Sequence, residues 1–154
     1  MLEGELYFVM SMCQWPEDKA AAARALWDVP LGQRTRLLAQ QFQVRPRKHL
    51  GQTFLINEHA ADGIAEAVAE LEPAGVVEIG GGLGALSVSL LRRMAKLRLI
   101  VYEVDSLLCE ALAYLLCPAA RRCQIHCADF TEANPLQAGA EHGWVVVGNL
   151  PYSV

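Results

Sequence analysis

The sequence predicts an α/β fold of the Rossmann-like kind, built around a parallel β-sheet. Three observations predict it. Short apolar runs alternate with helical periodicity from about residue 57 onward, the glycine run Gly80–Gly84 joins one such strand to a helix, and polar residues follow each of four predicted strands. Strands that alternate with helices form parallel sheets with right-handed crossovers. Ligands of such sheets bind outside the carboxyl ends of the strands.

Residues 1–44 are predicted to form a helical extension that precedes this sheet. Proline and acidic residues favour the first turn of a helix, so a helix is expected to start near Pro16 and to run to about Trp27. Val29-Pro30 breaks it, and a second helix follows to about Phe42. Residues before Pro16 show no clear period.

Residues 45–154 are predicted to form the sheet-containing domain. Asn57 is a candidate cap for the first helix, whose apolar residues Ile64, Val68 and Leu71 recur at helical spacing. The predicted helices cover residues 58–71, 85–96 and 106–116, the predicted strands cover residues 76–79, 97–103, 123–127 and 144–147, and residues 131–143 are expected to be irregular or a short helix.

Composition excludes several classes of protein. Of 154 residues, 53% are hydrophobic and 19% are charged, which allows a packed core and argues against global disorder. The apolar runs are far shorter than the roughly 20 residues of a membrane span. Glu3 and Glu5 precede the apolar segment Leu6–Met12, whereas a signal peptide carries basic residues there. Five cysteines without framework spacing indicate free thiols and a cytoplasmic protein.

The charge of the chain is unevenly distributed. The net charge of −4 and the pI of about 5.5 are unusual for a nucleic-acid-binding domain, which is usually basic. Three basic groups nevertheless stand out. The first holds Arg34, Arg36 and Arg45–His49, the second spans Arg92–Arg98, and the third is Arg121-Arg122. A solvated surface explains the second and third groups as well as a binding role does. The first group, which precedes the glycine run, is the better candidate for contact with phosphate.

The glycine run and an acid after the next strand predict a nucleoside-binding site. Gly80, Gly82 and Gly84 allow a sharp turn and let backbone N–H groups approach a ligand, and with Ala85 they also fit the dinucleotide fingerprint. Glu103 follows about 20 residues later, where an acid can accept hydrogen bonds from ribose hydroxyls. These features do not distinguish NAD from S-adenosylmethionine.

Two later motifs make that distinction. Asp129 after the third strand can accept a hydrogen bond from an adenine amino group, and Phe130 can cover the ring. In Asn149-Leu-Pro-Tyr152, the Asn149 side-chain oxygen and the Leu150 carbonyl can orient an adenine amino group so that its lone pair faces a methyl donor. Pro151 would hold the turn rigid and Tyr152 would stack on a flipped base. An NAD enzyme has no use for this tetrapeptide.

These motifs together resemble the small-subunit rRNA adenine dimethyltransferase family. The resemblance is carried in order by Lys48–Leu55 (Lys-His-Leu-Gly-Gln-Thr-Phe-Leu), Glu78–Leu86 (Glu-Ile-Gly-Gly-Gly-Leu-Gly-Ala-Leu), Glu103, Asp129 and Gly148–Tyr152. It implies an incomplete class I S-adenosylmethionine methyltransferase fold with its first four parallel strands in the order 3-2-1-4. It also implies dimethylation of the 6-amino groups of two adjacent adenosines in small-subunit rRNA, with the immature small ribosomal subunit as partner.

The resemblance assigns roles to residues by position. It places a catalytic centre at Asn149, Leu150, Pro151 and Tyr152. It implies no metal and no membrane. The cofactor S-adenosylmethionine would contact Thr53, Leu55, Gly80, Gly82, Glu103, Asp129 and Asn149, and RNA would contact Arg45, Arg47 and Lys48.

The chain departs from the family pattern in four ways. Thr53 replaces an asparagine or histidine, which is expected to weaken a cofactor contact. Gly81 replaces a proline, which is expected to loosen the loop. Ser153-Val154 is not the family's continuation after the tyrosine, and the chain stops there. The strand at Trp144–Val147 is then expected to lie at a sheet edge, and the isolated chain to be poorly soluble or inactive.

Three alternatives remain open. One is the large-subunit rRNA adenine methyltransferase group, which has similar motifs at the Gly-Gln-Thr-Phe-Leu55 and Asn149–Tyr152 positions. A second is a non-catalytic fragment that binds the cofactor or RNA. A third is half of an NAD-dependent oxidoreductase. Cys123, His126 and Cys127 could suggest a metal site, but strand alternation separates the histidine from the two cysteines, so core cysteines are expected.

Overall fold

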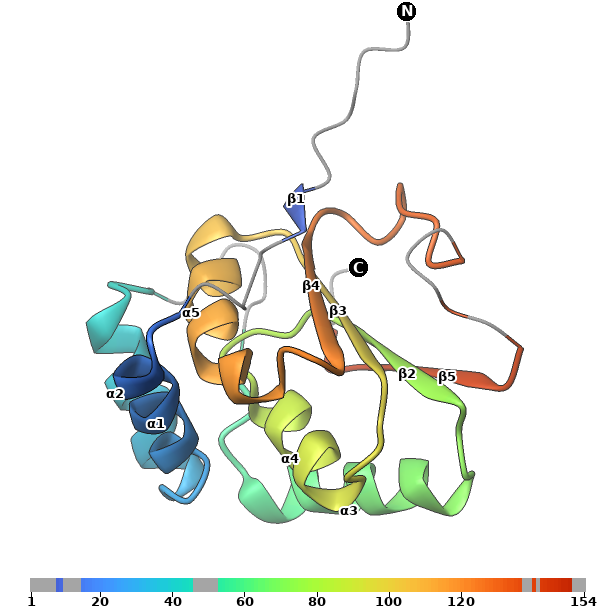
Figure 1. Ribbon diagram of the computed structural model, residues 1–154, viewed down its shortest axis with the longest axis horizontal. Coiled ribbons are helices and arrows are strands. Elements are labelled where there is room, and N and C mark those ends of the chain that lie inside the picture. Colours follow the sequence, from blue (N-terminus) through green and yellow to red (C-terminus); the bar gives the residue numbers. More distant parts are fainter. Residues whose placement is uncertain (1–7, 10–14, 46–52, 137–139, 141, 151–154) are drawn as a thin grey trace, which may run out of the picture.

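The computed structural model describes residues 8–9, 15–45, 53–136, 140 and 142–150. Its centre is a sheet with strand order β1-β4-β3-β2-β5 (Figure 1). The four parallel strands are β2 (Gly75–Ile79), β3 (Leu99–Glu103), β4 (Cys123–Cys127) and β5 (Trp144–Gly148). The predicted order 3-2-1-4 of the parallel strands is confirmed.

The short strand β1 was not predicted. It covers Phe8–Val9 and pairs antiparallel with β4, with Phe8 opposite Cys127 and Val9 opposite His126. A two-residue strand is too short to show the alternation by which strands are recognised in a sequence. Its pairing covers the outer edge of β4.

The helices follow the predicted order. They are α1 (Glu17–Leu26), α2 (Leu31–Gln41), α3 (Glu58–Glu70), α4 (Ala85–Arg93) and α5 (Ser106–Leu116), followed by the 3₁₀ turn η3 (Cys117–Ala119). Asn57 caps α3 as predicted, because its side chain accepts a hydrogen bond from Ala60 N at 3.1 Å. Helix α4 ends three residues before the predicted Lys96, since Met94 adopts an extended conformation.

The two faces of the sheet are covered differently. Helix α4 packs against α3, and the side chains of α4 and α5 form the main core with one face of the strands, around Val76, Val101 and Ile125. The other face has a smaller apolar cluster built on Val77, Ile100 and Tyr102. The connection between β4 and β5 covers this second face with Phe130 and Ala140. The described residues of this connection contain no helix, in agreement with the irregular alternative predicted for residues 131–143.

Helices α1 and α2 pack onto the same core. The indole Nε1 of Trp27 donates a buried hydrogen bond of 2.8 Å to the carbonyl of Leu115 in α5. Trp15 and Phe42 both contact the ring of Tyr114, with centroid distances of 5.6 and 5.7 Å. A hydrogen bond from a buried tryptophan fixes the position of α1 on α5.

Strand β5 lies at the other edge of the sheet. Among the described residues it pairs with β2 alone, and the side chain of Val146 is 57% exposed. The expectation that this valine-rich strand forms an edge is confirmed. Within the described part of the chain, no helix is long and apolar enough to cross a membrane.

Candidate functional site

The glycine loop between β2 and α4 lies at the carboxyl edge of the sheet. Gly80, Gly82 and Gly84 have φ values of 74°, 56° and 77°, in the left-handed region that favours glycine. The amide of Gly80 donates to the carbonyl of Tyr102 on β3 at 2.8 Å, and Gly84 stands directly before α4. The predicted sharp turn is therefore present.

Gly81 has a different role from its neighbours. A β-carbon at this position would lie 2.5 Å from Val101 Cγ1 and 2.8 Å from Leu112 Cδ1. Its amide also faces the carbonyl of Tyr102 at 3.4 Å, a bond that proline cannot make. The sequence predicted a loosened loop here. In the structure the missing side chain lets the loop approach β3 and α5 closely, which the sequence did not predict.

Glu103 ends β3 and holds the loop from the other side. Its Oε2 accepts from Gly82 N at 2.9 Å, and its Oε1 accepts from Val104 N at 2.9 Å and Asp105 N at 3.1 Å. A carboxylate has about four acceptor positions, so three backbone bonds leave room for a further donor such as a ribose hydroxyl. The side chain is buried, and these bonds fix its orientation.

The segment that begins at Thr53 approaches the glycine turn. The side-chain Nδ2 of Asn149 lies 3.5 Å from the carbonyl oxygen of Thr53, although 96 positions separate the two residues. Around Gly80, Asn149 O and Leu150 Cδ2 lie within 4 Å of where a β-carbon would stand. Phe54 lies equally close to Gly82. The ends of two strands and the segment that begins at Thr53 thus meet in one place.

Two other predicted cofactor residues lie at the margins of this place. The half-buried Leu55 packs with Leu31, Ala61 and Ala85 behind the segment. Asp129 is exposed, and its Oδ1 accepts from the amide and the hydroxyl of Thr131 at 2.8 and 2.7 Å. Hydrogen bonds from Thr131 lower the pKa of Asp129, so its carboxylate stays charged as an acceptor.

An aromatic residue follows Asp129 as expected. Phe130 contacts Tyr102 edge to face, with ring centroids 5.3 Å apart. Tyr102 also lies 5.0 Å from the ring of His126, which places that histidine on the face of the sheet opposite the buried Cys123. Among the described residues, no group of three or more His, Cys, Asp or Glu side chains is arranged to hold a metal ion.

Some of the remaining predicted site residues lie within the described part of the chain and others lie outside it. Arg45 is exposed at the end of a described segment, after Val44. Arg47 and Lys48, predicted to contact RNA, lie outside the described residues. So do Pro151 and Tyr152 of the predicted catalytic tetrapeptide. Of that tetrapeptide, Asn149 and Leu150 are described and both are exposed.

One residue of the predicted motif, Glu78, was given no role of its own from the sequence. Glu78 is fully buried beneath the glycine loop, where Ser87 Oγ donates to its Oε2 at 2.5 Å. Burial raises the pKa of Glu78 to about 8, although the Ser87 hydrogen bond acts in the opposite direction. An acid inside the apolar run Val76–Ile79 was the available signal, since an acid is rarely buried in a strand unless it is paired.

The fold and the position of this site define a class of protein. Parallel strands in the order 3-2-1-4, a glycine turn after the first and an acid after the second form the Rossmann-like core of class I S-adenosylmethionine-dependent methyltransferases. A proposed RNA methyltransferase from Pyrococcus horikoshii has this fold, with a TM-score of 0.59 and 21% identity over 90% of this chain and 61% of its own. A proposed O-methyltransferase from Klebsiella pneumoniae gives a TM-score of 0.50 and 18% identity, over 81% and 53% of the two chains.

Sequence comparison narrows the class to one family. The model of the family "Ribosomal RNA adenine dimethylase" matches residues 43–154, and the chain belongs to that family. Among its curated relatives, the ribosomal RNA small subunit methyltransferase A of Anoxybacillus flavithermus is 35% identical over 132 residues, which are 82% of this chain and 44% of that protein. The protein of the same name from Thermotoga maritima is 37% identical over 116 residues, or 75% and 39%. The chain thus spans about two fifths of the length of these relatives.

Proposed function

We propose that this chain carries the methyl-donor site and the adenine-orienting residues of an enzyme that dimethylates the 6-amino groups of adjacent adenosines in small-subunit rRNA. The observation that supports this most directly is the meeting of Asn149 with Thr53 and the Gly80 turn. The partner would be the immature small ribosomal subunit, and the compartment the cytoplasm.

The described residues fit S-adenosylmethionine. Gly80 and Gly82 adopt the left-handed conformation and have no β-carbon, so a ligand can approach the main chain of the loop. Glu103, held by three backbone amides, would accept a ribose hydroxyl, and Asp129 would accept from the adenine amino group. Thr53 and Leu55 would lie along the methionine part.

Asn149 and Leu150 would orient the amino group that is methylated. Since Asn149 Nδ2 is directed at the Thr53 carbonyl, its Oδ1 is directed away from it and is available as an acceptor. The Leu150 carbonyl would be a second acceptor, Pro151 would fix the turn and Tyr152 would stack on the base. Two acceptors align the lone pair of the weakly nucleophilic adenine nitrogen. S-adenosylmethionine supplies, when bound, a methyl group on a sulfonium centre, which is a good leaving group, so positioning is the main task of the protein.

Arg45, Arg47 and Lys48 would contact RNA phosphates near this centre. They precede Thr53 in the chain, and Thr53 contacts Asn149 directly. A cation beside the target nucleotide would hold the phosphate backbone without reading the base.

A single-turnover assay tests this function. The chain, in excess over an RNA that carries two adjacent loop adenosines, is incubated with methyl-labelled S-adenosylmethionine, and the digested nucleosides are identified by mass spectrometry. The proposed function predicts label in N6-methyl- and N6,N6-dimethyladenosine that is lost in Asn149→Ala, whereas the expectation that the isolated chain is inactive predicts no transfer, so the assay decides between the two. Label on another nucleoside would contradict the proposal. Binding of the methyl donor without transfer would favour the non-catalytic alternative.

A further inference from the structure

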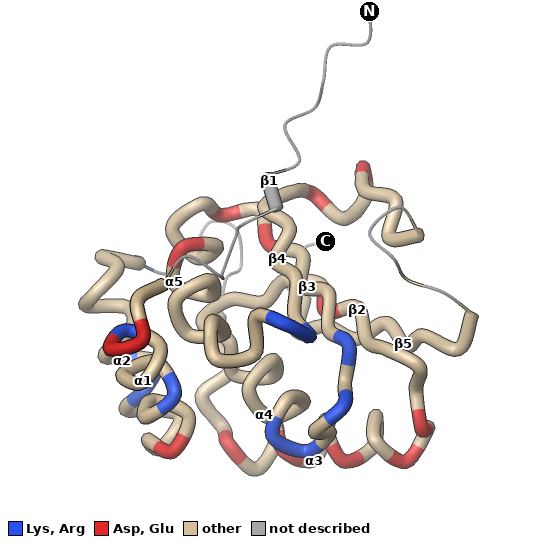
Figure 2. Tube along the Cα trace, viewed as in Figure 1, with Lys and Arg blue, Asp and Glu red and all other residues tan. Residues whose placement is uncertain are grey.

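Basic residues from two segments gather at the edge of the sheet opposite the site. Arg92, Arg93, Lys96 and Arg98 lie between the end of α4 and the start of β3, and Arg121 and Arg122 directly precede β4. The two segments are neighbours, because Leu99 N donates to the carbonyl of Arg122 at 2.8 Å. Figure 2 shows this basic edge and the acids that follow the strands at the other edge.

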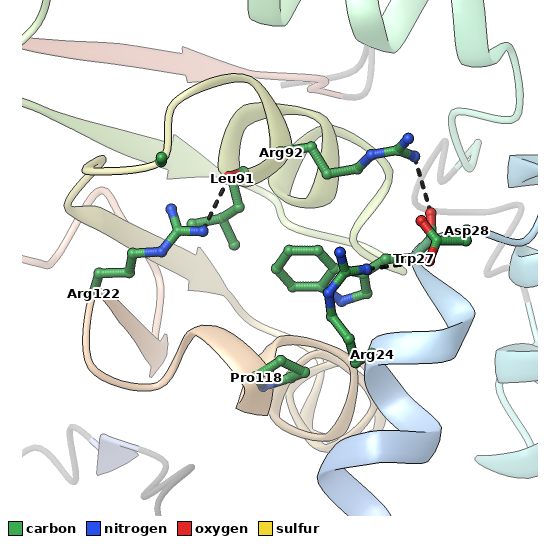
Figure 3. A pocket seen from close by; sticks show the side chains of 8 residues that line it. Arg24, Trp27, Asp28, Leu91, Arg92, Pro118 and Arg122 are labelled. Carbon is green, nitrogen blue, oxygen red and sulfur yellow. Dashed lines mark hydrogen bonds and ion pairs between the residues drawn. The ribbon is translucent and has the colours of Figure 1, made fainter.

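A hollow of about 380 Å³ opens between this edge and α1 (Figure 3). Three arginines line it, Arg24, Arg92 and Arg122, together with a single acid, Asp28, which forms an exposed ion pair with Arg24 at 3.4 Å. The balance of charge therefore favours an anion. Two of the guanidinium groups are held in place by backbone carbonyls, which reduces the entropy lost when a ligand binds.

The anchoring contacts are specific. Arg122 donates to Leu91 O at 3.0 Å and to Met94 O at 3.1 Å, and Arg92 donates to Trp27 O at 3.0 Å. A guanidinium has five N–H donors, so these bonds leave others for a ligand. Binding of carbonyls at the ends of α4 and α1 also stabilises those helix ends, and this explains Arg92 and Arg122 without any ligand.

Helix capping does not explain the rest of the basic edge. Arg93 forms an exposed ion pair with Glu66 at 2.7 Å. Lys96 and Arg121 are exposed, and neither has a hydrogen bond or an ion pair with any described residue. The exposed positive charges of Lys96 and Arg121 on neighbouring segments are therefore available to an anion, and this favours a binding role over a merely solvated surface.

We propose that five residues of this basic edge, Arg92, Arg93, Lys96, Arg121 and Arg122, together with Arg24 on the α1 side of the hollow, bind the phosphate backbone of a second RNA segment. This segment is separate from the one that carries the target adenosines. Each parallel strand has five residues, so the basic edge and the carboxyl edge are about 16 Å apart. A nucleotide whose base reaches Asn149 therefore does not itself contact the basic edge. The inference rests on the proposed RNA substrate.

Two matched double variants test the inference. Lys96→Gln/Arg121→Gln removes one lysine and one arginine from the basic edge and leaves the anchored Arg92 and Arg122 in place. Lys19→Gln/Arg36→Gln removes the same charges from exposed positions on α1 and α2. Both variants have the same net charge, so any difference between them comes from position.

The measurement is the dissociation constant for a fluorescent RNA, followed by anisotropy from 50 to 200 mM salt. The RNA holds the adenosine loop and a neighbouring helix, and a second probe holds the loop alone. The basic-edge variant is expected to bind the longer RNA about 10-fold more weakly at 50 mM salt, with a log–log salt slope smaller by about 1.5 to 2. It is expected to bind the loop probe as the parent chain does. The control variant is expected to match the parent chain on both probes.

Equal salt slopes for the two variants, or no RNA binding by the parent chain, would overturn the inference. A calorimetric titration with S-adenosylmethionine separates this result from the proposed function. If the methyl donor binds and the variants do not differ, the inference fails alone. If the variants differ and the methyl donor does not bind, the proposed function fails while the phosphate-binding edge remains.

Discussion

The side-chain amide of Asn149 lies 3.5 Å from the backbone carbonyl of Thr53. This contact joins the end of β5 to the segment that begins at Thr53. Because a backbone carbonyl accepts, the contact does not depend on the side chain at position 53. The replacement of the family's asparagine or histidine by Thr53 therefore leaves the orientation of Asn149 intact.

Replacing Asn149 with alanine is expected to reduce the single-turnover rate of methyl transfer by on the order of 100-fold. The change removes both the acceptor for the target amine and the donor to Thr53. Asn134→Ala is a suitable control, because Asn134 is exposed and, among the described residues, its side chain accepts from the nearby Leu136 amide alone. A rate for Asn149→Ala within about 3-fold of the control, well short of the 100-fold expected from misplacement, would contradict the assigned role.

Restoring a side chain at position 81 is expected to destabilise the fold. Gly81→Ala brings a β-carbon against Val101 and Leu112, and overpacking of this kind lowers the free energy of unfolding by about 1–3 kcal/mol. Gly81→Pro is expected to lower the free energy of unfolding further, since the hydrogen bond from the Gly81 amide to the Tyr102 carbonyl is also lost. Urea denaturation measures both changes.

Gly63→Ala provides a control of opposite sign for that experiment. Gly63 lies inside α3, and a β-carbon there meets no atom within 4 Å. Alanine is the better helix former by about 0.5–1 kcal/mol, so this variant is expected to be more stable than the parent chain. Stabilisation by Gly81→Ala would show that the loop is not packed as described.

The stability of the chain is expected to fall as pH rises toward 8. Burial raises the pKa of Glu78 from the ordinary 4.5 to about 8, so between these values the folded chain holds a proton that the unfolded chain has released. The free energy of unfolding then decreases with pH, by at most about 1.4 kcal/mol per pH unit. Its contribution is complete below pH 4.5 and is lost as pH passes about 8.

Glu78→Gln is expected to flatten that dependence, whereas Glu110→Gln, an exposed change on α5, is expected to keep it. The measurement is urea denaturation at intervals from pH 5 to pH 9. Parallel pH profiles for the parent chain and Glu78→Gln would show that Glu78 does not titrate in this interval.

Lysine at position 146 is expected to reduce aggregation. Val146 is exposed on the edge strand β5, and a charge on an edge strand opposes pairing with another chain. Leu71→Lys removes a comparably exposed apolar side chain from the end of α3, away from the sheet. Light scattering against protein concentration compares the two. An equal effect would mean that general hydrophobicity, and not the strand edge, governs association.

Much of the fold could be predicted from the sequence because strong local signals agree with the tertiary structure. Strand β2, its glycine turn and α4 follow from the apolar run, the positive φ that glycine allows, and helical periodicity. The pairing of β1 with β4 could not be predicted, because two residues carry no period. The role of Gly81 could not be predicted either, since it depends on Val101 and Leu112, which are distant in the sequence.

The site was predictable at the level of residue types and less so at the level of contacts. Glu103 and Asn149 were identified by their places after strands, and the structure brings both to the glycine turn. That three backbone amides hold Glu103, and that Glu78 is buried beneath the loop, depends on how separate segments pack. The amides around Glu103 have no signature in one sequence, whereas the apolar run Val76–Ile79 was an available signal for the burial of Glu78. The division of the chain near residue 44 stays a prediction.

The central claim is that the glycine turn and Glu103 hold S-adenosylmethionine, and a calorimetric titration tests it most directly. The chain is expected to bind S-adenosylmethionine and not NAD. Glu103→Gln is expected to weaken binding by about 10-fold or more, because an amide cannot accept all the bonds that the carboxylate does, while Glu110→Gln leaves it unchanged. Tight binding of NAD without binding of S-adenosylmethionine, or an affinity that Glu103→Gln does not alter, would contradict the account.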